Sequence, residues 1–231
     1  MVVSDRRLST RTLGAATDFS LTVFWMHGLG ATNTDFDPII PWLQVEGIRF
    51  VFPQAPELPV GINFGMRMPA WYDIRRPDQG LEREDPIGIE RSRSAVQGWV
   101  DAQVEAGLAA SSIVLAGFSQ GGAMALYTAL RCPHALAGAM VLSGYLLRPE
   151  RLAADATDAN KTMPILFCHG IQDDVVPLSR AEAACRAVEE GRRVEFQRDV
   201  GGHGIAPPAI PTIGQWLRER QRENGSRARR G

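Results

Sequence analysis

SIVLAGFSQGGAMALY, residues 112–127, is the stretch that decides the fold of this chain. Its first part, Ser112–Ala116, is apolar enough for a buried strand, and its last part, Gly122–Tyr127, suits a helix. Between them lies a Gly-x-Ser-x-Gly pattern, in which a sharp strand-to-helix turn pushes Ser119 out at its tip. The flanking glycines remove side chains that would collide with the backbone there. The pattern predicts a nucleophilic serine; an ordinary serine in a glycine-rich turn is the alternative.

The rest of the chain alternates short apolar runs with amphipathic ones, which is typical of a parallel sheet covered by helices. Most runs are continuously apolar, and this favours strands that are buried on both faces. The predicted strands are Leu21–Met26, Arg49–Phe52, Ser112–Ala116, Ala139–Leu142 and Pro164–Cys168, with Arg192–Gln197 nearer an edge. Residues before Leu21 are expected to add a less buried strand or hairpin. The predicted fold class is α/β, with a mostly parallel central sheet flanked by helices.

Several segments outside the strands carry patterns of their own. Apolar residues at spacings of three and four predict a helix over Val96–Leu108. The segment Ser179–Glu182 has the form of a capping box and predicts a helix start, and a last helix is expected from near Pro211. Pro53–Asp85 is predicted to be a long functional loop, for example a lid or pocket wall. Residues 1–217 are predicted to form one domain, and the Arg-rich residues 218–231 a solvated, disordered tail.

Composition excludes several classes of protein. The 231 residues are 45% apolar and 22% charged, as in an ordinary globular domain, and the net charge of −1 argues against a nucleic-acid binder. No run approaches the roughly 18 apolar residues of a membrane helix, and the N-terminus lacks the apolar core of a secretory signal. Three cysteines without metal-ligand spacing, Cys132, Cys168 and Cys185, favour a cytoplasmic protein with reduced thiols. We expect a small-molecule substrate and no stable membrane insertion; a homodimer stays open.

A serine nucleophile needs a base within hydrogen-bond reach, and the chain has four histidines to supply one. His203 lies in a flexible glycine-rich loop after the last strand, where a mobile imidazole could meet Ser119. His169 ends a buried strand and His27 directly follows the first, so both suit structural roles better. His134 lies in a predicted surface turn. We therefore predict His203 as the base.

The base in turn needs a carboxylate that orients it and stabilises its charged form. Asp173 and Asp174 are adjacent and follow a strand, so either could supply it. With Asp173, the chain order of serine, acid and histidine is that expected of an α/β-hydrolase. An oxyanion also needs two amide donors. We predict the N–H of Gln120, directly after the serine, and that of Leu29 in the glycine-rich loop after the first strand.

These residues together resemble the phospholipase/carboxylesterase family of α/β-hydrolases, which includes bacterial carboxylesterases and acyl-protein thioesterases. The motifs that carry the resemblance are Met26-His27-Gly28-Leu29-Gly30, Phe52-Pro53-Gln54-Ala55-Pro56, Met68-Pro69-Ala70-Trp71-Tyr72-Asp73-Ile74, Gly117-Phe118-Ser119-Gln120-Gly121-Gly122-Ala123, and His169-Gly170 followed by Asp173. The family's acid, the third residue after the glycine of the His-Gly pair, falls on Asp173, and its histidine falls on His203. Here the histidine stands between Gly202 and Gly204, a more glycine-rich loop than is usual in the family.

The resemblance implies an esterase without metal or other cofactor that acts on short to medium acyl chains. It also implies that Pro59–Ile74 forms part of the acyl pocket. Apolar residues suited to that role are Ile62, Phe64, Met66, Met68 and Trp71, together with Val175. We therefore predict a serine carboxylesterase that works through an acyl-serine. The alternatives are an acyl-protein thioesterase or lysophospholipase, a serine peptidase, and a hydrolase-fold protein that binds ligands without turnover.

Overall fold

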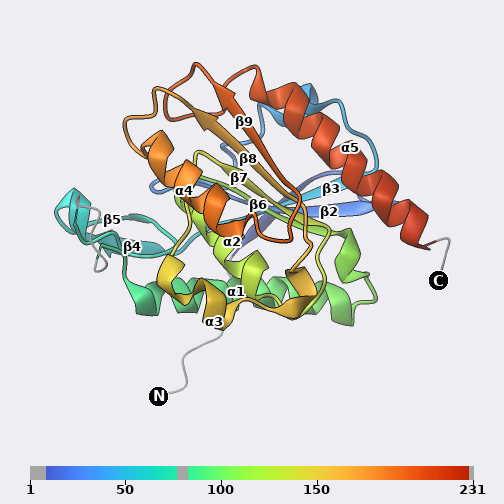
Figure 1. Ribbon diagram of the computed structural model, residues 1–231, viewed down its shortest axis with the longest axis horizontal. Coiled ribbons are helices and arrows are strands. Elements are labelled where there is room, and N and C mark those ends of the chain that lie inside the picture. Colours follow the sequence, from blue (N-terminus) through green and yellow to red (C-terminus); the bar gives the residue numbers. More distant parts are fainter. Residues whose placement is uncertain (1–8, 77–82, 229–231) are drawn as a thin grey trace.

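A sheet of seven strands forms the centre of the computed structural model, which describes residues 9–76 and 83–228 (Figure 1). The spatial order is β1-β3-β2-β6-β7-β8-β9; β1 is antiparallel to β3 and the other neighbours are parallel. The strands are β1 Thr10–Gly14, β2 Leu21–Met26, β3 Ile48–Pro53, β6 Ile113–Phe118, β7 Gly138–Leu142, β8 Ile165–Gly170 and β9 Val194–Asp199. The predicted α/β class with a mostly parallel sheet is confirmed, and β9 begins two residues later than predicted.

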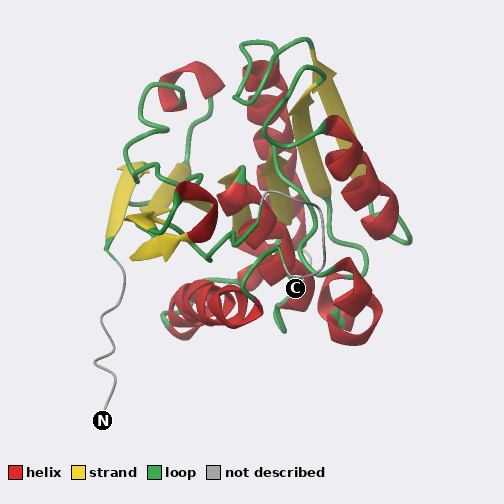
Figure 2. Cartoon of the chain, turned by 90° about the vertical axis from the view of Figure 1, so that its left-hand side faces the viewer, coloured by secondary structure: helices red, strands yellow, loops and turns green. Residues whose placement is uncertain are grey.

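Helices cover both faces of the sheet, as the turned view in Figure 2 shows. Alternate residues of β2 enter two separate cores: Phe24 belongs to the core that includes residues of α1, α2 and α4, whereas Trp25 belongs to the core that includes residues of η1 and α5. The helices are α1 Pro86–Glu105, α2 Gln120–Arg131, α3 Leu152–Asp155, α4 Leu178–Val188 and α5 Ala209–Ala228. Short 3₁₀ segments are η1 Ile40–Leu43, η2 Gly61–Asn63, η3 Ala110–Ser112, η4 Pro149–Arg151 and η5 Asp158–Asn160. The buried strands thus need apolar side chains on both faces, which explains their continuous apolar runs.

Two local predictions are wrong. The segment Pro53–Asp85 is not one irregular loop, because it contains the hairpin of β4 Glu57–Val60 and β5 Met66–Pro69. The predicted capping box does not form either: α4 begins at Leu178 after Pro177, and no side chain caps it. Ser179 lies inside the first turn instead. Proline fits this entry because its fixed φ is compatible with the turn that precedes a helix.

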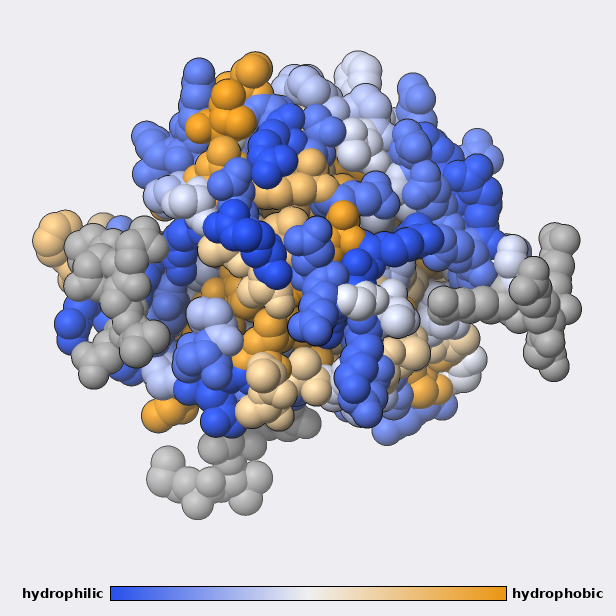
Figure 3. Space-filling model, viewed as in Figure 1, coloured by the Kyte–Doolittle hydropathy of each residue, from blue (hydrophilic) through white to orange (hydrophobic). Residues whose placement is uncertain are grey.

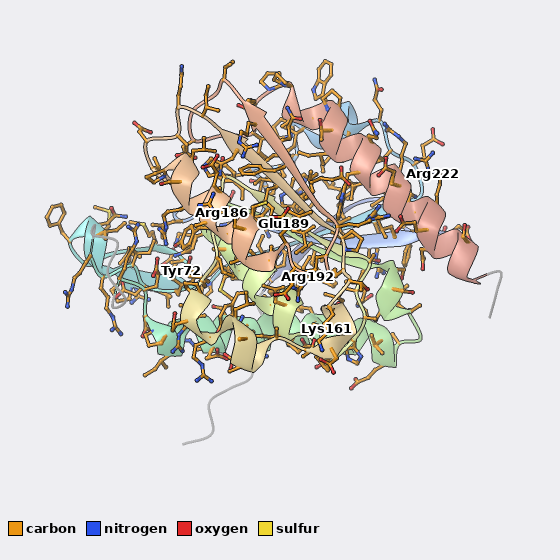
Figure 4. The ribbon with its side chains drawn as sticks, in the orientation of Figure 1. Tyr72, Lys161, Arg186, Glu189, Arg192 and Arg222 are labelled. Carbon is orange, nitrogen blue, oxygen red and sulfur yellow. The ribbon has the colours of Figure 1, made fainter. Side chains whose placement is uncertain are left out.

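The C-terminal segment is helical rather than disordered through Ala228, so the predicted tail is wrong for residues 218–228. The outward surface of α5 is mostly hydrophilic (Figure 3), and Arg222 lies on its exposed side (Figure 4). Polar contacts nevertheless hold this half of the helix. Gln221 Nε2 donates to Ser20 Oγ at 2.8 Å and to the Glu46 carbonyl at 2.9 Å, and Asn224 Nδ2 donates to the Ser20 carbonyl at 3.0 Å. Residues 229–231 lie outside the described part of the chain.

Among the helices of the described residues, none has the length and apolar character that crossing a bilayer requires.

We expect the substitution Gln221→Ala to lower the free energy of unfolding by about 1–2 kcal/mol, because it removes bonds that tie α5 to Ser20 in the β1–β2 loop and to Glu46 in the loop before β3. Urea denaturation measures the change. Gln215→Ala is the matched control: Gln215 is exposed on the same helix, and among the described residues its side chain bonds only to Glu219 one turn on, so its loss should stay within about 0.5 kcal/mol. Equal effects of the two substitutions would contradict this account of the helix.

Candidate active site

Ser119 stands at the sharp turn between β6 and α2. Its backbone has φ 53° and ψ −119°, a region that non-glycine residues rarely occupy, and its N–H donates to the Leu142 carbonyl of β7 at 2.8 Å. A β-carbon on Gly117 would lie 2.2 Å from the backbone of Gly121, and one on Gly121 would lie 2.3 Å from the Met26 carbonyl oxygen. The two glycines therefore permit the close packing that holds the serine in this strained conformation.

A continuous chain of hydrogen bonds joins Ser119, His203 and Asp173. The Ser119 Oγ lies 2.9 Å from His203 Nε2, and His203 Nδ1 lies 2.8 Å from Asp173 Oδ2. The Asp173 side chain is completely buried, and its other oxygen accepts from the amides of Val175 at 3.0 Å and Val176 at 2.7 Å. Because Nδ1–H donates to the carboxylate, Nε2 is left to accept the serine proton.

The structure distinguishes between the neighbouring acids and between the histidines. Asp174 is exposed, whereas Asp173 points into the protein. His169 is buried on β8 and its Nε2 donates to the Val176 carbonyl at 2.8 Å, with Asp173 Oδ2 at 3.4 Å. His134 pairs with Asp101 at 3.0 Å and lies away from the serine. The fold brings His203, the predicted base, to Ser119, and it brings Asp173, the predicted acid, to His203.

The glycine-rich loop that carries the imidazole is anchored on both sides. The amide of Gly201 donates to Asp199 Oδ1 at 2.7 Å, and its carbonyl accepts from the Gln172 amide at 3.0 Å. On the far side, Ser143 Oγ donates to the Gly204 carbonyl at 3.3 Å. The loop is therefore held by hydrogen bonds on both sides of His203, although glycines flank this residue.

Leu29 and Gln120 both border the cavity at Ser119. Gln120 is the first residue of α2, where N–H groups have no acceptor within the helix and the helix dipole favours negative charge. The Leu29 N–H donates to no acceptor within residues 9–76 and 83–228. Both donors are therefore available to an oxygen atom that enters the cavity.

His27 supports the loop that carries Leu29 and does not reach the serine. Its buried ring bonds through Nδ1 to the Gly28 carbonyl at 2.7 Å, and its Nε2 accepts from the Ala55 amide at 3.0 Å. Desolvation by burial lowers the pKa of His27, although the bond to Gly28 opposes the shift. The Trp71 indole N–H donates to the His27 carbonyl at 2.8 Å. The lowered pKa favours the neutral ring, which joins the loop of Leu29 to the segment at Ala55.

The side chain of Gln120 has a role that sequence reasoning missed. Buried behind the serine, it accepts from the Trp71 amide and donates to the Tyr72 carbonyl, both at 2.8 Å. Tyr72, which lies between the β4–β5 hairpin and α4 in Figure 4, in turn bonds to the Tyr145 hydroxyl at 2.8 Å. No local pattern could indicate these contacts, because the partners of Gln120 lie 48 and 49 residues away along the chain.

A cavity of about 250 Å³ opens beside Ser119 and His203. Its walls are mostly apolar and come from Leu29, Ile62, Ile74, Phe118, Tyr145 and Val175. Of the residues predicted to bind substrate, Ile62 and Val175 border this cavity, but Phe64, Met66, Met68 and Trp71 do not.

The four residues outside the cavity lie in the β4–β5 hairpin or directly after it. Phe64 follows η2 with a φ of 55°, and this left-handed turn leaves its side chain fully exposed at the tip. Met66 is also exposed, Trp71 is buried beneath the site, and Met68 is half-buried with its sulfur 3.2 Å from Asn63 Nδ2. For these four residues, the prediction that they line the pocket is therefore wrong. Within the described residues, no group of three potential ligands is arranged to hold a metal ion.

The sequence of this chain is similar to those of known proteins. The sequence profile of the Phospholipase/Carboxylesterase family matches residues 15–209. The chain belongs to this family. It is 32% identical over 229 residues to acyl-protein thioesterase 1 of Gibberella zeae, covering 94% of this chain and 97% of the relative. It is 35% identical over 180 residues to acyl-protein thioesterase 1 of Schizosaccharomyces pombe, covering 77% and 80%.

Solved structures agree with that assignment. Arabidopsis thaliana SOBER1 superposes with a TM-score of 0.81 at 28% identity, over 87% of this chain and 98% of that one. Zea mays acyl-protein thioesterase 2 has a TM-score of 0.80 at 25% identity, over 93% and 99%. This member of the phospholipase/carboxylesterase family is therefore a serine hydrolase of acyl esters or thioesters, and the predicted resemblance is confirmed.

We expect buried His27 to make the protein less stable in acid. Its folded-state pKa lies below the value of about 6.5 of an unfolded chain, so below that pH the unfolded state binds more protons. The free energy of unfolding should therefore fall as the pH drops through this window, by at most about 1.4 kcal/mol per pH unit from this residue. Urea denaturation between about pH 5 and pH 8 should show a shallower dependence for His27→Gln. His134→Gln is the control, because its ring is partly exposed; an unchanged slope in His27→Gln would contradict the assignment.

Proposed function

We propose that Ser119 is the nucleophile, His203 the general base and acid, and Asp173 the residue that orients the imidazole. The observation that carries the proposal is the unbroken path from Ser119 Oγ through the imidazole to a buried carboxylate, with contacts of 2.9 and 2.8 Å. Such a path lets a serine hydroxyl lose its proton as it attacks a carbonyl carbon.

The reaction then proceeds in two halves. As Ser119 Oγ bonds to the substrate carbonyl carbon, His203 Nε2 takes the hydroxyl proton and the carbonyl oxygen becomes an oxyanion between the Leu29 and Gln120 amides. Collapse of this intermediate expels the alcohol or thiol, which receives the proton from His203, and leaves an acyl-serine. A water molecule, deprotonated by His203, repeats the attack and releases the acid. The Asp173 carboxylate stabilises the imidazolium in both halves.

Short to medium acyl chains are the proposed substrates, carried as thioesters or oxygen esters. The cavity of about 250 Å³ is smaller than the roughly 300–1,000 Å³ of sites that enclose a drug-sized ligand. Its walls, including Ile62 and Val175, are apolar and suit an alkyl chain. Both kinds of ester develop the same oxyanion, so one pair of amides serves either.

Acylated proteins are a second candidate for the substrate, and the relatives favour them. Four fungal proteins named acyl-protein thioesterase 1 are 32–36% identical to this chain. An acyl group on a protein surface would enter the same cavity and use the same side chains. The two candidates therefore differ in the carrier and chain length of the acyl group rather than in the chemistry.

Replacing either of two adjacent acids tests the proposed roles. We expect Asp173→Asn to reduce kcat by about 10³- to 10⁴-fold on 4-nitrophenyl butyrate, because the amide cannot hold the imidazole in the working tautomer. Asp174→Asn is the matched control and should leave kcat within about twofold, because its side chain points to solvent. If Asp174→Asn proves the more damaging substitution, the acid is misassigned.

Substrates that differ in the group carrying the acyl chain, compared at constant enzyme concentration, distinguish the two candidates. We expect kcat/KM to be highest for butyryl to octanoyl esters and thioesters and to decline for palmitoyl ones, because the cavity is small. A palmitoylated peptide serves as the protein-like substrate. Faster turnover of that peptide than of any short ester would favour the second candidate. Ser119→Ala should abolish both turnover and labelling by a fluorophosphonate probe; persistent labelling of this variant would refute the nucleophile.

A further inference from the structure

His169 is a buried polar side chain that the proposed mechanism does not use. It lies near the end of β8 and is 1% exposed. Because successive side chains of a strand point to opposite faces, it shares its face with Ile165 and Phe167, which belong to an apolar core. A polar ring among such neighbours costs free energy unless it is hydrogen-bonded. The groups that the ring contacts therefore explain why a histidine is accommodated at this position.

The ring contacts two groups of the turn that carries Asp173. His169 Nε2 lies 2.8 Å from the Val176 carbonyl oxygen and 3.4 Å from Asp173 Oδ2. A carbonyl oxygen can only accept a hydrogen bond, so Nε2 carries a proton. One N–H group thus lies close both to the carboxylate at the start of the turn and to the carbonyl at its end.

Val176 connects the ring to the other oxygen of the acid. Its amide donates to Asp173 Oδ1 at 2.7 Å, and the Val175 amide donates to the same oxygen at 3.0 Å. Within the described part of the chain, no donor other than His169 reaches the Val176 carbonyl. Pro177 follows and restricts the backbone of Val176 to extended conformations. A continuous set of contacts therefore runs from the imidazole through Val176 to the carboxylate.

We propose that His169 is a positioning residue that sets the orientation of the Asp173 carboxylate and, through it, that of the His203 imidazole. The inference rests on the proposed function, in which Asp173 is the acid, and adds a second histidine to it. Asp173 Oδ2 lies 2.8 Å from His203 Nδ1, and the Asp173 side chain is completely buried, so water cannot replace a contact that the carboxylate loses. The described residues that border the cavity at Ser119 do not include His169. Its effect is therefore on the rate rather than on substrate binding.

Loss of the N–H group would act on the acid in two ways. The Val176 carbonyl, in a residue only 4% exposed, would have no donor, and an unmet buried acceptor is costly enough to make the turn rearrange. Asp173 Oδ2 would also lose the second N–H group that lies near it. Both changes let the carboxylate rotate away from His203 Nδ1. An apolar side chain could fill the same space but would not supply this constraint.

A double-mutant cycle that combines His169→Phe with Asp173→Ala tests the proposal. Phenylalanine keeps an aromatic ring at the position but has no N–H group, and alanine removes the carboxylate through which the ring is proposed to act. The measured quantities are kcat and KM for 4-nitrophenyl butyrate, per mole of protein whose fold is checked by circular dichroism. The rate of Ser119→Ala is subtracted as background.

In the wild-type background we expect His169→Phe to lower kcat about tenfold and to change KM by less than about threefold. In the Asp173→Ala background the same substitution should change kcat by less than about twofold, because no carboxylate is left to orient. His169→Gln should recover most of the lost rate, since its amide nitrogen can donate from nearly the position of Nε2. If His169→Phe does not fold, His169→Asn replaces it, because the shorter side chain places no donor there.

Cys168→Ala is the matched control for damage to β8. Cys168 precedes His169 on the same strand and is also buried, but its side chain belongs to the core on the opposite face of the sheet. Its replacement should lower stability and leave kcat within about twofold of the wild-type value. A loss of kcat in His169→Phe is then not explained by a weakened strand.

The backgrounds separate this inference from the proposed function. An equal loss of kcat in both backgrounds overturns the inference, because the ring then acts on the fold and not through the acid. A loss below about twofold in the wild-type background also overturns it, and so does a failure of His169→Gln to recover the rate. Asp173→Ala alone would still be far less active than wild type in all three cases. Wild-type activity in Asp173→Ala would instead refute the acid of the proposed function.

Discussion

The contact between α2 and β2 is the constraint on which the site depends. Gly121 approaches β2 so closely that a β-carbon would come within 2.5 Å of the carbonyl oxygens of both Met26 and His27. One end of this contact carries Ser119 and the amide of Gln120, and the other leads directly into the loop with Leu29. A side chain at the contact would push the helix away from the strand and separate Ser119 from Leu29, one of the two proposed oxyanion donors. The strained backbone of Ser119 persists because packing on both sides leaves it no alternative.

The same groups that line the site also hold the core together. Gln120 offers its amide to the cavity while its side chain bonds to the backbone of Trp71 and Tyr72. The Trp71 indole then bonds to the carbonyl of His27, whose ring fixes the loop of Leu29. The two proposed oxyanion donors are therefore connected through buried hydrogen bonds as well as through the main chain. In a buried network of this kind each unmet bond is costly, so the donors are held in place before substrate arrives.

The elements that could be predicted from sequence are those that depend on local pattern. Continuous apolar runs identified the buried strands, and the glycines around Ser119 identified the turn, because both follow from neighbouring residues. The second half of α5 could not be predicted in this way. Gln221 bonds to carbonyls 174 and 175 residues earlier in the chain, and the Arg-rich sequence around it does not indicate these distant partners. Apolar composition likewise could not tell that Ile62 borders the cavity while Phe64 points outward, because the turn between them sets the direction of each side chain.

The loop of His203 shows how glycine can help to position a side chain rather than make it mobile. A β-carbon on Gly170, at the end of β8, would lie 2.2 Å from the carbonyl oxygen of Gly201. This close approach lets the Gln172 amide bond to the same carbonyl, so the loop after β8 and the loop after β9 are joined through their backbones. Asp173 follows directly on the first of these loops. The separation of acid and imidazole is therefore set by the packing of two adjacent parallel strands, and the glycines next to the histidine are compatible with a fixed ring.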